Sequence, residues 1–176
     1  MVYNEQVQNL LDAAKTALRK GSYSRALEKL SDLETHVILQ HIELPTETNE
    51  LYIRACRMAA RQELPRAIKR ARRHVKKGKY VFAQLTLEVV DGYAQEGGVV
   101  LPDEFVDIRR EVYRLGVPEN VSFAQGRLEQ GDYFYVKVAL GNMETSATKL
   151  GIPVPESVQE LRREFEKLNT HQSSSN

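Results

Sequence analysis

The chain contains one cysteine, no tryptophan and no apolar run near the roughly 18 residues that a bilayer span requires. The lone Cys56 excludes an intrachain disulfide framework and a zinc site made of several cysteines. The four histidines form no HExxH pattern, and the Gly97-Gly98 pair lacks the Lys-Ser/Thr of a phosphate-binding loop. We therefore expect no membrane span, and no recognised catalytic motif is present.

Two sets of polar residues come closest to a chemical site. The first set consists of Glu34, His36, His41 and Glu43, whose side chains carry atoms that can bind a metal ion. Its two histidines are five residues apart and do not share a helix face, so we interpret the set as a polar helix end and loop. The second set is the acids Glu34, Asp91 and Glu144, which recur at equivalent positions. Solvated positions near helix ends explain them better than a catalytic group.

Cys56 is expected at the rim of its helix rather than in the core. Neighbouring Arg54, Arg57 and Arg61 would lower the pKa of a thiol there. No His or Asp partner lies within reach in the sequence, so a reactive thiol is the minor alternative. The sequence therefore predicts a protein that is not an enzyme and that uses no metal and no cofactor.

Charge is distributed unevenly along the 176 residues, although the net charge is only +1. Residues 1–50 carry 5 Lys/Arg and 8 Asp/Glu, residues 51–80 carry 11 and 1, and residues 81–176 carry 9 and 15. A basic middle thus lies between two acidic flanks. The length favours a single compact domain or a short repeat array.

Three segments of the chain are similar to one another: KGSYSRALEKLSDLE from Lys20, KGKYVFAQLTLEVVD from Lys77 and QGDYFYVKVALGNME from Gln130. Their glycines, Gly21, Gly78 and Gly131, are 57 and 53 residues apart. The prolines that follow, Pro45, Pro102 and Pro155, keep the same two intervals. Two independent markers with the same spacing indicate an internal repeat.

Each marker has a structural reason. A glycine after a helical stretch supplies the left-handed residue that ends a helix, and a proline followed by an acid suits a helix start. No stretch alternates with period two, so the chain is predicted to be all-α. We predict about nine helices in three tandem three-helix repeats, at about 2–62, 63–116 and 117–169, in a compact array or short α-solenoid. Residues 1–169 then form one domain, and residues 170–176 a disordered tail.

Each turn glycine is followed two residues later by a tyrosine, namely Tyr23, Tyr80 and Tyr133. We interpret these rings as packing across the turn with their hydroxyls at the surface, because tyrosine combines an apolar ring with a polar tip. Stacking on a ligand is the minor alternative.

The densest positive charge lies at 64–80, LPRAIKRARRHVKKGKY. With the arginines just upstream it gives a candidate partner-binding patch of eleven residues: Arg54, Arg57, Arg61, Arg66, Lys69, Arg70, Arg72, Arg73, Lys76, Lys77 and Lys79. Like charges at helical spacing repel one another, at a cost of roughly 2–4 kcal/mol in all. The equivalent helix of the third repeat has Gln125, Glu129 and Gln130 at the positions of Arg72, Lys76 and Lys77. The fold therefore does not require the positive charge.

Three explanations of this basic patch compete. Its cations could be solvated or paired within the chain, for which Glu28, Asp32 and Glu34 are available. They could bind an acidic protein partner, including a second copy of this chain. They could instead bind nucleic acid through residues 54–79 by contacting phosphates. Against nucleic acid, few aromatic residues are interleaved with the basic ones, and no recognised nucleic-acid motif is present.

The hairpin around each Gly-x-Tyr, with Ala26 or Ala83 three residues after the tyrosine, resembles that of tetratricopeptide-type repeats, although the period and the third helix differ. A closer resemblance, over about Leu11–Glu96, is to the YfdX family of bacterial helical proteins. It is carried by ALRKGSYSRALEKL, VILQHIELPTETNELY and VKKGKYVFAQLTLEVVDG. The present chain has an extra helical stretch between its Leu-Pro and the next Gly-x-Tyr. The resemblance implies a stress-associated, chaperone-like protein of the bacterial periplasm, with no catalytic residues.

The sequence as a whole predicts a non-enzymatic helical-repeat protein that binds an acidic protein partner or associates with itself. Nucleic-acid binding through residues 54–79 is the alternative. The N-terminal residues lack the basic start and apolar run of a signal peptide, which favours the cytoplasm. The periplasm is the alternative if a signal peptide was removed before residue 1.

Overall fold

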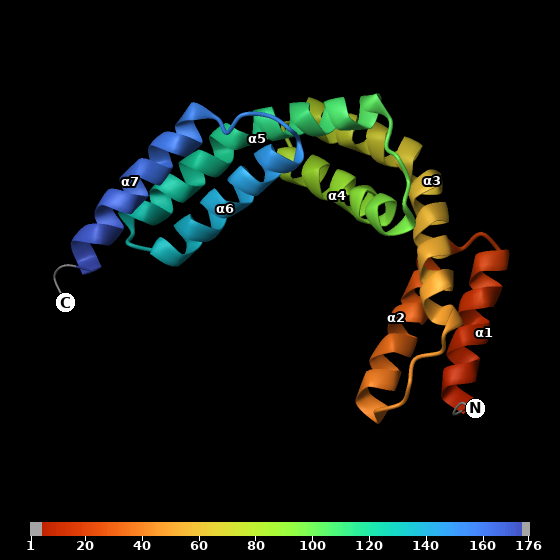
Figure 1. Cartoon of the computed structure of the whole chain (residues 1–176). Coiled ribbons are helices and arrows are strands. Elements are labelled where there is room, and N and C mark those ends of the chain that lie inside the picture. The colour runs from red at the N-terminus through yellow and green to blue at the C-terminus, as the bar shows by residue number, and fades with distance from the viewer. Residues whose placement is uncertain (1–4, 174–176) are drawn as a thin grey trace. The chain divides into compact units, whose positions relative to one another are not determined.

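The computed structural model describes residues 5–173, which form α-helices joined by short loops and contain no strand (Figure 1). The helices are α1 (Glu5–Arg19), α2 (Tyr23–Gln40), α3 (Glu47–Lys76), α4 (Tyr80–Gly97), α5 (Asp103–Glu129), α6 (Tyr133–Lys149) and α7 (Glu156–Ser173). The prediction of an all-α chain is confirmed. Of the predicted tail, residues up to Ser173 belong to α7, and the last three lie outside the described residues.

The described residues form seven helices rather than the nine predicted, because two pairs of predicted helices are continuous. Helix α3 runs through the boundary predicted at 62/63, and α5 runs through the one at 116/117. Each contains an interior proline, Pro65 or Pro118. A proline there costs about 3 kcal/mol, but α5 buries Val112, Val117 and Val121 on both sides of it. Each such side chain contributes about 1.5–3 kcal/mol, so packing outweighs the lost hydrogen bond.

The contacts divide the chain into two compact units. Unit 1 comprises the chain up to Arg70 together with Thr86–Leu101, and unit 2 comprises Ala71–Leu85 and the chain from Pro102 onward. The division passes through α3 and α4, so each unit receives one part of each of these helices. None of the helices in the described residues is long and apolar enough to cross a membrane.

Unit 1 is built on the α1–α2 hairpin, which lies beside the first part of α3 in Figure 1. Apolar residues of α1 recur every three or four positions and meet those of α2. One cluster joins Val7, Leu11, Leu33 and Val37, and a second joins Ala14, Ala17, Ala26, Leu30 and Ala55. Small alanines let α1, α2 and α3 approach closely.

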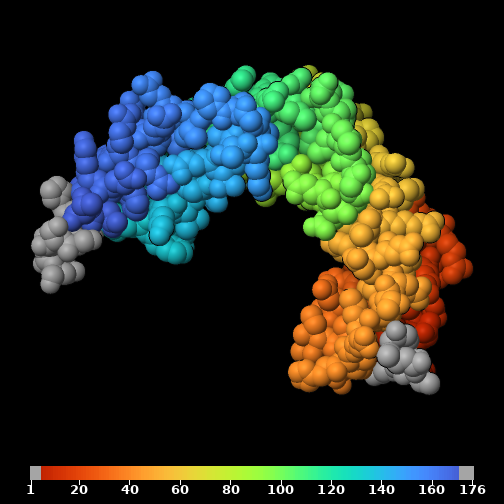
Figure 2. Space-filling model, viewed as in Figure 1, coloured from red at the N-terminus to blue at the C-terminus, as the bar shows by residue number. Residues whose placement is uncertain are grey.

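Unit 2 has its core between α5, α6 and α7. The buried residues are Tyr113, Val117, Val121, Ala124, Leu128, Val136, Leu140, Met143, Ala147, Leu150, Val158, Leu161 and Phe165. On the face shown in Figure 2, the atoms of α6 and α7 (blue) lie next to one another at the surface of this unit. This core fixes the positions of α5 and α6, which carry much of the site described below.

The three turn glycines adopt the left-handed backbone that the sequence predicts, with φ of 69° at Gly21, 66° at Gly78 and 74° at Gly131. In each turn the residue after the glycine donates its N–H to a carbonyl five residues back, at 2.9 Å. The tyrosine two residues after each glycine is half-buried, and carbons added at Gly21 and Gly131 would lie 4.0 and 3.9 Å from ring carbons of Tyr23 and Tyr133. Tyr23 and Tyr133 therefore pack on their turns, whereas a carbon added at Gly78 would meet nothing within 4 Å, so Tyr80 does not contact its turn glycine in this way.

Helices α2, α4 and α6 also end alike. The residues that turn the chain are His41, Gly98 and Gly151, all with positive φ, and the next N–H bonds a carbonyl five residues back. His41 is the one residue other than glycine in the described chain that adopts positive φ. Each following helix begins one or two residues after its proline, as predicted for Pro45, Pro102 and Pro155.

Each unit also contains an arginine that ties a long helix to the end of the following one. In unit 1, Arg57 donates its Nε–H to the carbonyl of Gly97 at 2.9 Å. In unit 2, Arg110 donates its Nε–H to the carbonyl of Leu150 at 3.2 Å. The two bonds span the same separation of 40 residues.

Candidate functional site

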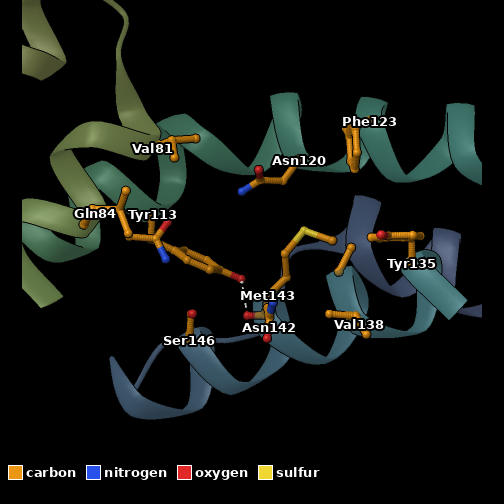
Figure 3. A pocket seen from close by; sticks show the side chains of 12 residues that line it. Val81, Gln84, Tyr113, Asn120, Phe123, Tyr135, Val138, Asn142, Met143 and Ser146 are labelled. Carbon is orange, nitrogen blue, oxygen red and sulfur yellow. Dashed lines mark hydrogen bonds between the residues drawn. The ribbon is translucent and has the colours of Figure 1, made fainter.

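An apolar groove in unit 2, with a volume of about 330 Å³, is lined by exposed aromatic residues among others (Figure 3). Its apolar walls are Val81 and Leu85 of α4, Phe123 of α5, and Tyr135 and Val138 of α6. These side chains are between 44 and 56% exposed. Large apolar residues gathered at one place on a surface mark a binding site more often than scattered ones do.

The floor of the groove is held by Tyr113 on α5. Its hydroxyl donates a hydrogen bond to the carbonyl of Met143 at 2.9 Å, drawn as a dashed line in Figure 3. Burial raises the pKa of Tyr113, and the nearby charge of Glu144 acts in the same direction. The phenol therefore stays neutral at physiological pH and serves to fix α6 against α5.

Four polar residues line the same groove: Gln84, Asn120, Asn142 and Ser146. No lining residue carries a charge. The lining has no carboxylate, imidazole, thiol or amine. The groove is suited to binding through apolar contact and neutral hydrogen bonds.

Arg127 of α5 lies at one side of the groove between two of its aromatic residues. Its guanidinium carbon is 5.2 Å from the ring centroid of Phe123 and 5.3 Å from that of Tyr135. It also contacts a carboxylate oxygen of Asp132 at 3.5 Å. Cation–π contacts of this kind hold the guanidinium beside the groove while leaving the Arg127 side chain 38% exposed.

The exposed apolar residues are not needed to form a hairpin, because α2 lacks them. Helices α2, α4 and α6 each begin with a tyrosine, and the residues three, seven and ten places later are buried and apolar in all three. The residue five places later is Glu28 in α2, Leu85 in α4 and Val138 in α6. The core pattern is thus common to all three helices, whereas α4 and α6 have a second apolar face.

This groove was not predicted from the sequence. A signal for it was present, because Val81 and Leu85 on α4, and Tyr135 and Val138 on α6, are apolar outside the stripe that forms the core. Sequence spacing alone did not show that two such faces and Phe123 would meet at one place.

The predicted basic patch is exposed at all eleven positions, from Arg54 to Lys79. In unit 1, Arg57 is used for the bond to Gly97, and Arg66 pairs with Glu63 at 2.9 Å. The other unit 1 members, Arg54, Arg61, Lys69 and Arg70, have no ion-pair partner among the described residues.

In unit 2, Arg72 pairs with Glu104 at 2.8 Å. Lys79 lies 6.0 Å from the ring centroid of Phe82, on which His74 also stacks. Arg73, Lys76 and Lys77 have no acidic partner in the part of the chain that the structure describes.

Two of the three acids proposed to neutralise the patch, Glu28 and Asp32, are engaged elsewhere. Lys29 contacts Asp32 at 2.7 Å and Glu28 at 3.5 Å, all within α2. The hydrogen bond to Asp32 is the main cause that raises the pKa of Lys29. Internal pairing therefore covers only part of the basic patch.

Cys56 is fully buried rather than at the rim of its helix, which corrects the expectation of an accessible thiol. Burial raises the pKa of the Cys56 thiol, and the charge of Glu96 adds to this effect, whereas a hydrogen bond with Tyr52 opposes it. A buried, protonated thiol is a poor nucleophile.

The other polar sets do not form a chemical site. No group of three or more His, Cys, Asp or Glu side chains among the described residues is placed to hold a metal ion. Glu144 accepts a hydrogen bond from the Nε–H of Arg162 at 2.9 Å, and Asp91 accepts one from Gln95 at 3.2 Å. These acids have separate structural partners.

No protein-family model, no curated protein and no solved structure matches the chain. The apolar groove and the unpaired cations are therefore the features on which its function is argued.

Proposed function

We propose that this protein is a non-enzymatic helical-repeat protein that binds a segment of a protein partner in the apolar groove of unit 2. The carrying observation is the second apolar face of α4 and α6, which meets Phe123 and is about half exposed. Burying such side chains on binding contributes about 25 cal/mol per Å² of apolar surface. A partner that presents apolar side chains would gain this energy.

The proposal includes a tandem repeat in which the third helix of one repeat continues into the first helix of the next. Three observations support it: the turns at Gly21, Gly78 and Gly131, the left-handed residues that end α2, α4 and α6, and the arginine bonds that span 40 residues in each unit. In this arrangement each repeat can carry its own surface on a common core. Repeats 2 and 3 then carry the groove.

Cations beside the groove favour an acidic partner. Arg127 contacts two residues of the groove, and Lys76, Lys77 and Lys79 precede α4 directly in the chain. Charges at the edge of an interface act mainly on association rate and choice of partner. The resemblance to the YfdX family supports a stress-associated or chaperone-like role for such binding. We place the protein in the cytoplasm, with the periplasm as the alternative.

A random 12-residue peptide library, displayed on phage and selected on the full-length chain, tests this function. We expect enriched peptides rich in apolar and acidic residues. Leu85→Glu, which copies Glu28 of α2, should weaken their binding at least tenfold, while circular dichroism shows an unchanged helix content. Val100→Glu is the matched control, because Val100 is 94% exposed and outside the groove. Equal binding to the wild type and to Leu85→Glu would refute the proposal.

Nucleic-acid binding is the second candidate, favoured by the unpaired cations Lys69, Arg70, Arg73, Lys76 and Lys77. A protein that contacts six or more phosphates loses about 10³-fold or more in affinity between about 50 and 200 mM salt. Fluorescence anisotropy with a labelled single-stranded RNA checks this. The double variant Lys76→Gln/Lys77→Gln should reduce both affinity and salt slope, and Lys167→Gln on α7 should not. Absence of binding at low salt would exclude this candidate.

A further inference from the structure

We propose that the groove of unit 2 binds its partner as an extended, acidic peptide, with Asn120 and Asn142 hydrogen-bonded to the peptide backbone and Arg127 paired with a peptide carboxylate. This inference rests on the proposed function, in which the groove is the binding surface, and it specifies the form and charge of the ligand.

The two asparagines lie on opposite walls of the groove, Asn120 on α5 and Asn142 on α6. Figure 3 shows the side chain of Asn120 on the side of α5 that borders the groove. Neither side chain makes a hydrogen bond within the described residues. Each amide both donates and accepts, which is the combination that a peptide unit presents in return. Two such groups among apolar side chains indicate a ligand with polar groups spaced between apolar ones.

An extended peptide fits these amides better than a helix does. In an α-helix the backbone N–H and C=O groups bond to one another, and the apolar face of the helix would leave the asparagines without partners. Covering a polar group without giving it a hydrogen bond weakens binding. An extended segment keeps its backbone groups available and directs successive side chains to opposite sides. Alternate apolar side chains of the peptide would then contact Leu85, Phe123 and Val138.

The charges around the groove select an acidic segment. The lining itself is uncharged, and Arg127 is held over Phe123 and Tyr135 with its guanidinium half-exposed. Its contact with Asp132 is 3.5 Å long and uses one of five N–H donors. A carboxylate from the ligand can therefore bind beside Asp132. Lys79, near Phe82 and next but one to Val81 in the chain, adds a cation of the same unit.

The test uses the tightest peptide from the phage selection, synthesised with a fluorescent label, and the full-length protein. Asn120→Ala and Asn142→Ala should each weaken binding about five- to tenfold. Thr145→Ala on α6, exposed but outside the groove lining, is the matched control and should change nothing. Arg127→Gln should weaken binding more at about 50 mM salt than at about 500 mM, as expected of an ion pair.

Modified peptides test the conformation directly. N-methylation of single backbone amides should weaken binding about tenfold or more at one or two positions, because it removes a donor to an asparagine oxygen. Proline at a position whose amide is not contacted should be tolerated, whereas it would break a bound helix.

The possible results separate this inference from the proposed function. Peptides that lose binding to Leu85→Glu but not to the asparagine variants would overturn the extended mode and leave the groove as the binding site. Selected peptides with helical nuclear Overhauser contacts in the bound state would do the same. A dimer that Leu85→Glu dissociates, with no selected peptide competing for the groove, would show a second copy as the occupant and overturn this inference. Peptides indifferent to Leu85→Glu would overturn both proposals.

Discussion

Replacing Gly97 by alanine should destabilise unit 1, because the end of α4 touches the backbone of α3 there. A carbon added at Gly97 would lie 2.4 Å from the backbone nitrogen of Arg57 and 2.9 Å from the carbonyl carbon of Cys56. Both neighbours belong to a helix backbone and cannot move aside as the tip of a flexible side chain can. The substitution therefore forces α4 and α3 apart.

The size of the effect follows from three contributions. Overpacking of a close contact costs about 1–3 kcal/mol. Separating the helices also weakens the hydrogen bond from Arg57 to the Gly97 carbonyl, a contribution of about 0.5–1.5 kcal/mol. Alanine recovers about 0.5–1 kcal/mol through its lower backbone entropy in the unfolded chain. The free energy of unfolding should fall by about 1–3 kcal/mol.

Gly92 provides the matched control in the same helix. A carbon added there would meet nothing within 4 Å, so Gly92→Ala should raise the free energy of unfolding by about 0.5–1 kcal/mol. Urea unfolding followed by circular dichroism at pH 7 measures both variants, and their midpoints should shift in opposite directions. A Gly97→Ala midpoint equal to or above that of the wild type would refute the close contact. Arg57→Gln removes the hydrogen bond to Gly97 without the steric clash, so it should lower the free energy of unfolding by only about 0.5–1.5 kcal/mol.

Three further changes test other parts of the fold. His41→Gly should raise the free energy of unfolding by about 1 kcal/mol, because glycine adopts the left-handed backbone of this position without the strain that a side chain causes. A urea titration measures this, and an unchanged midpoint would contradict the turn geometry. Glu144→Gln should lower it by about 0.5–1 kcal/mol, and by less in about 1 M NaCl, because the pair with Arg162 is partly exposed. Because folding raises the pKa of the Cys56 thiol, the protonated thiol favours the folded chain. This contribution to the free energy of unfolding is fully present below the ordinary pKa of 9.0 and is lost as the pH rises through the raised pKa. Stability should therefore fall from about pH 9 to about pH 10.5 less steeply in Cys56→Ala, and a thiol reagent should label the native protein slowly.

The regular features of the chain could be predicted from its sequence because they depend on local chemistry. Glycines with positive φ, prolines before helices and apolar residues at helical spacing each act within a few residues. The joining of predicted helices could not be foreseen, because a proline normally ends or kinks a helix. At Pro118 the deciding term is the burial of Val117 and Val121 against other helices, and that is a property of the folded unit.

The groove could not be predicted from the sequence for a related reason. Leu85 and Val138 are 53 residues apart, and only the packing of α4, α5 and α6 brings their side chains to one hollow. The basic patch stood out because its charges are consecutive. The sequence predicted the charge and the exposure of this patch. The structure adds that Arg57 donates a hydrogen bond to the Gly97 carbonyl within the chain.

Both candidate surfaces follow one rule, which is that residues required for the fold are common to equivalent helices and residues available for function differ between them. Helix α2 forms its hairpin with Glu28 where α4 and α6 have Leu85 and Val138, so the hairpin does not need an apolar residue there. The exposed half of Leu85 and Val138 adds apolar surface that water covers in the free protein, and such surface favours association. The same unit places Asn120, Asn142 and Arg127 around these residues, and these are the groups that the proposed peptide would contact.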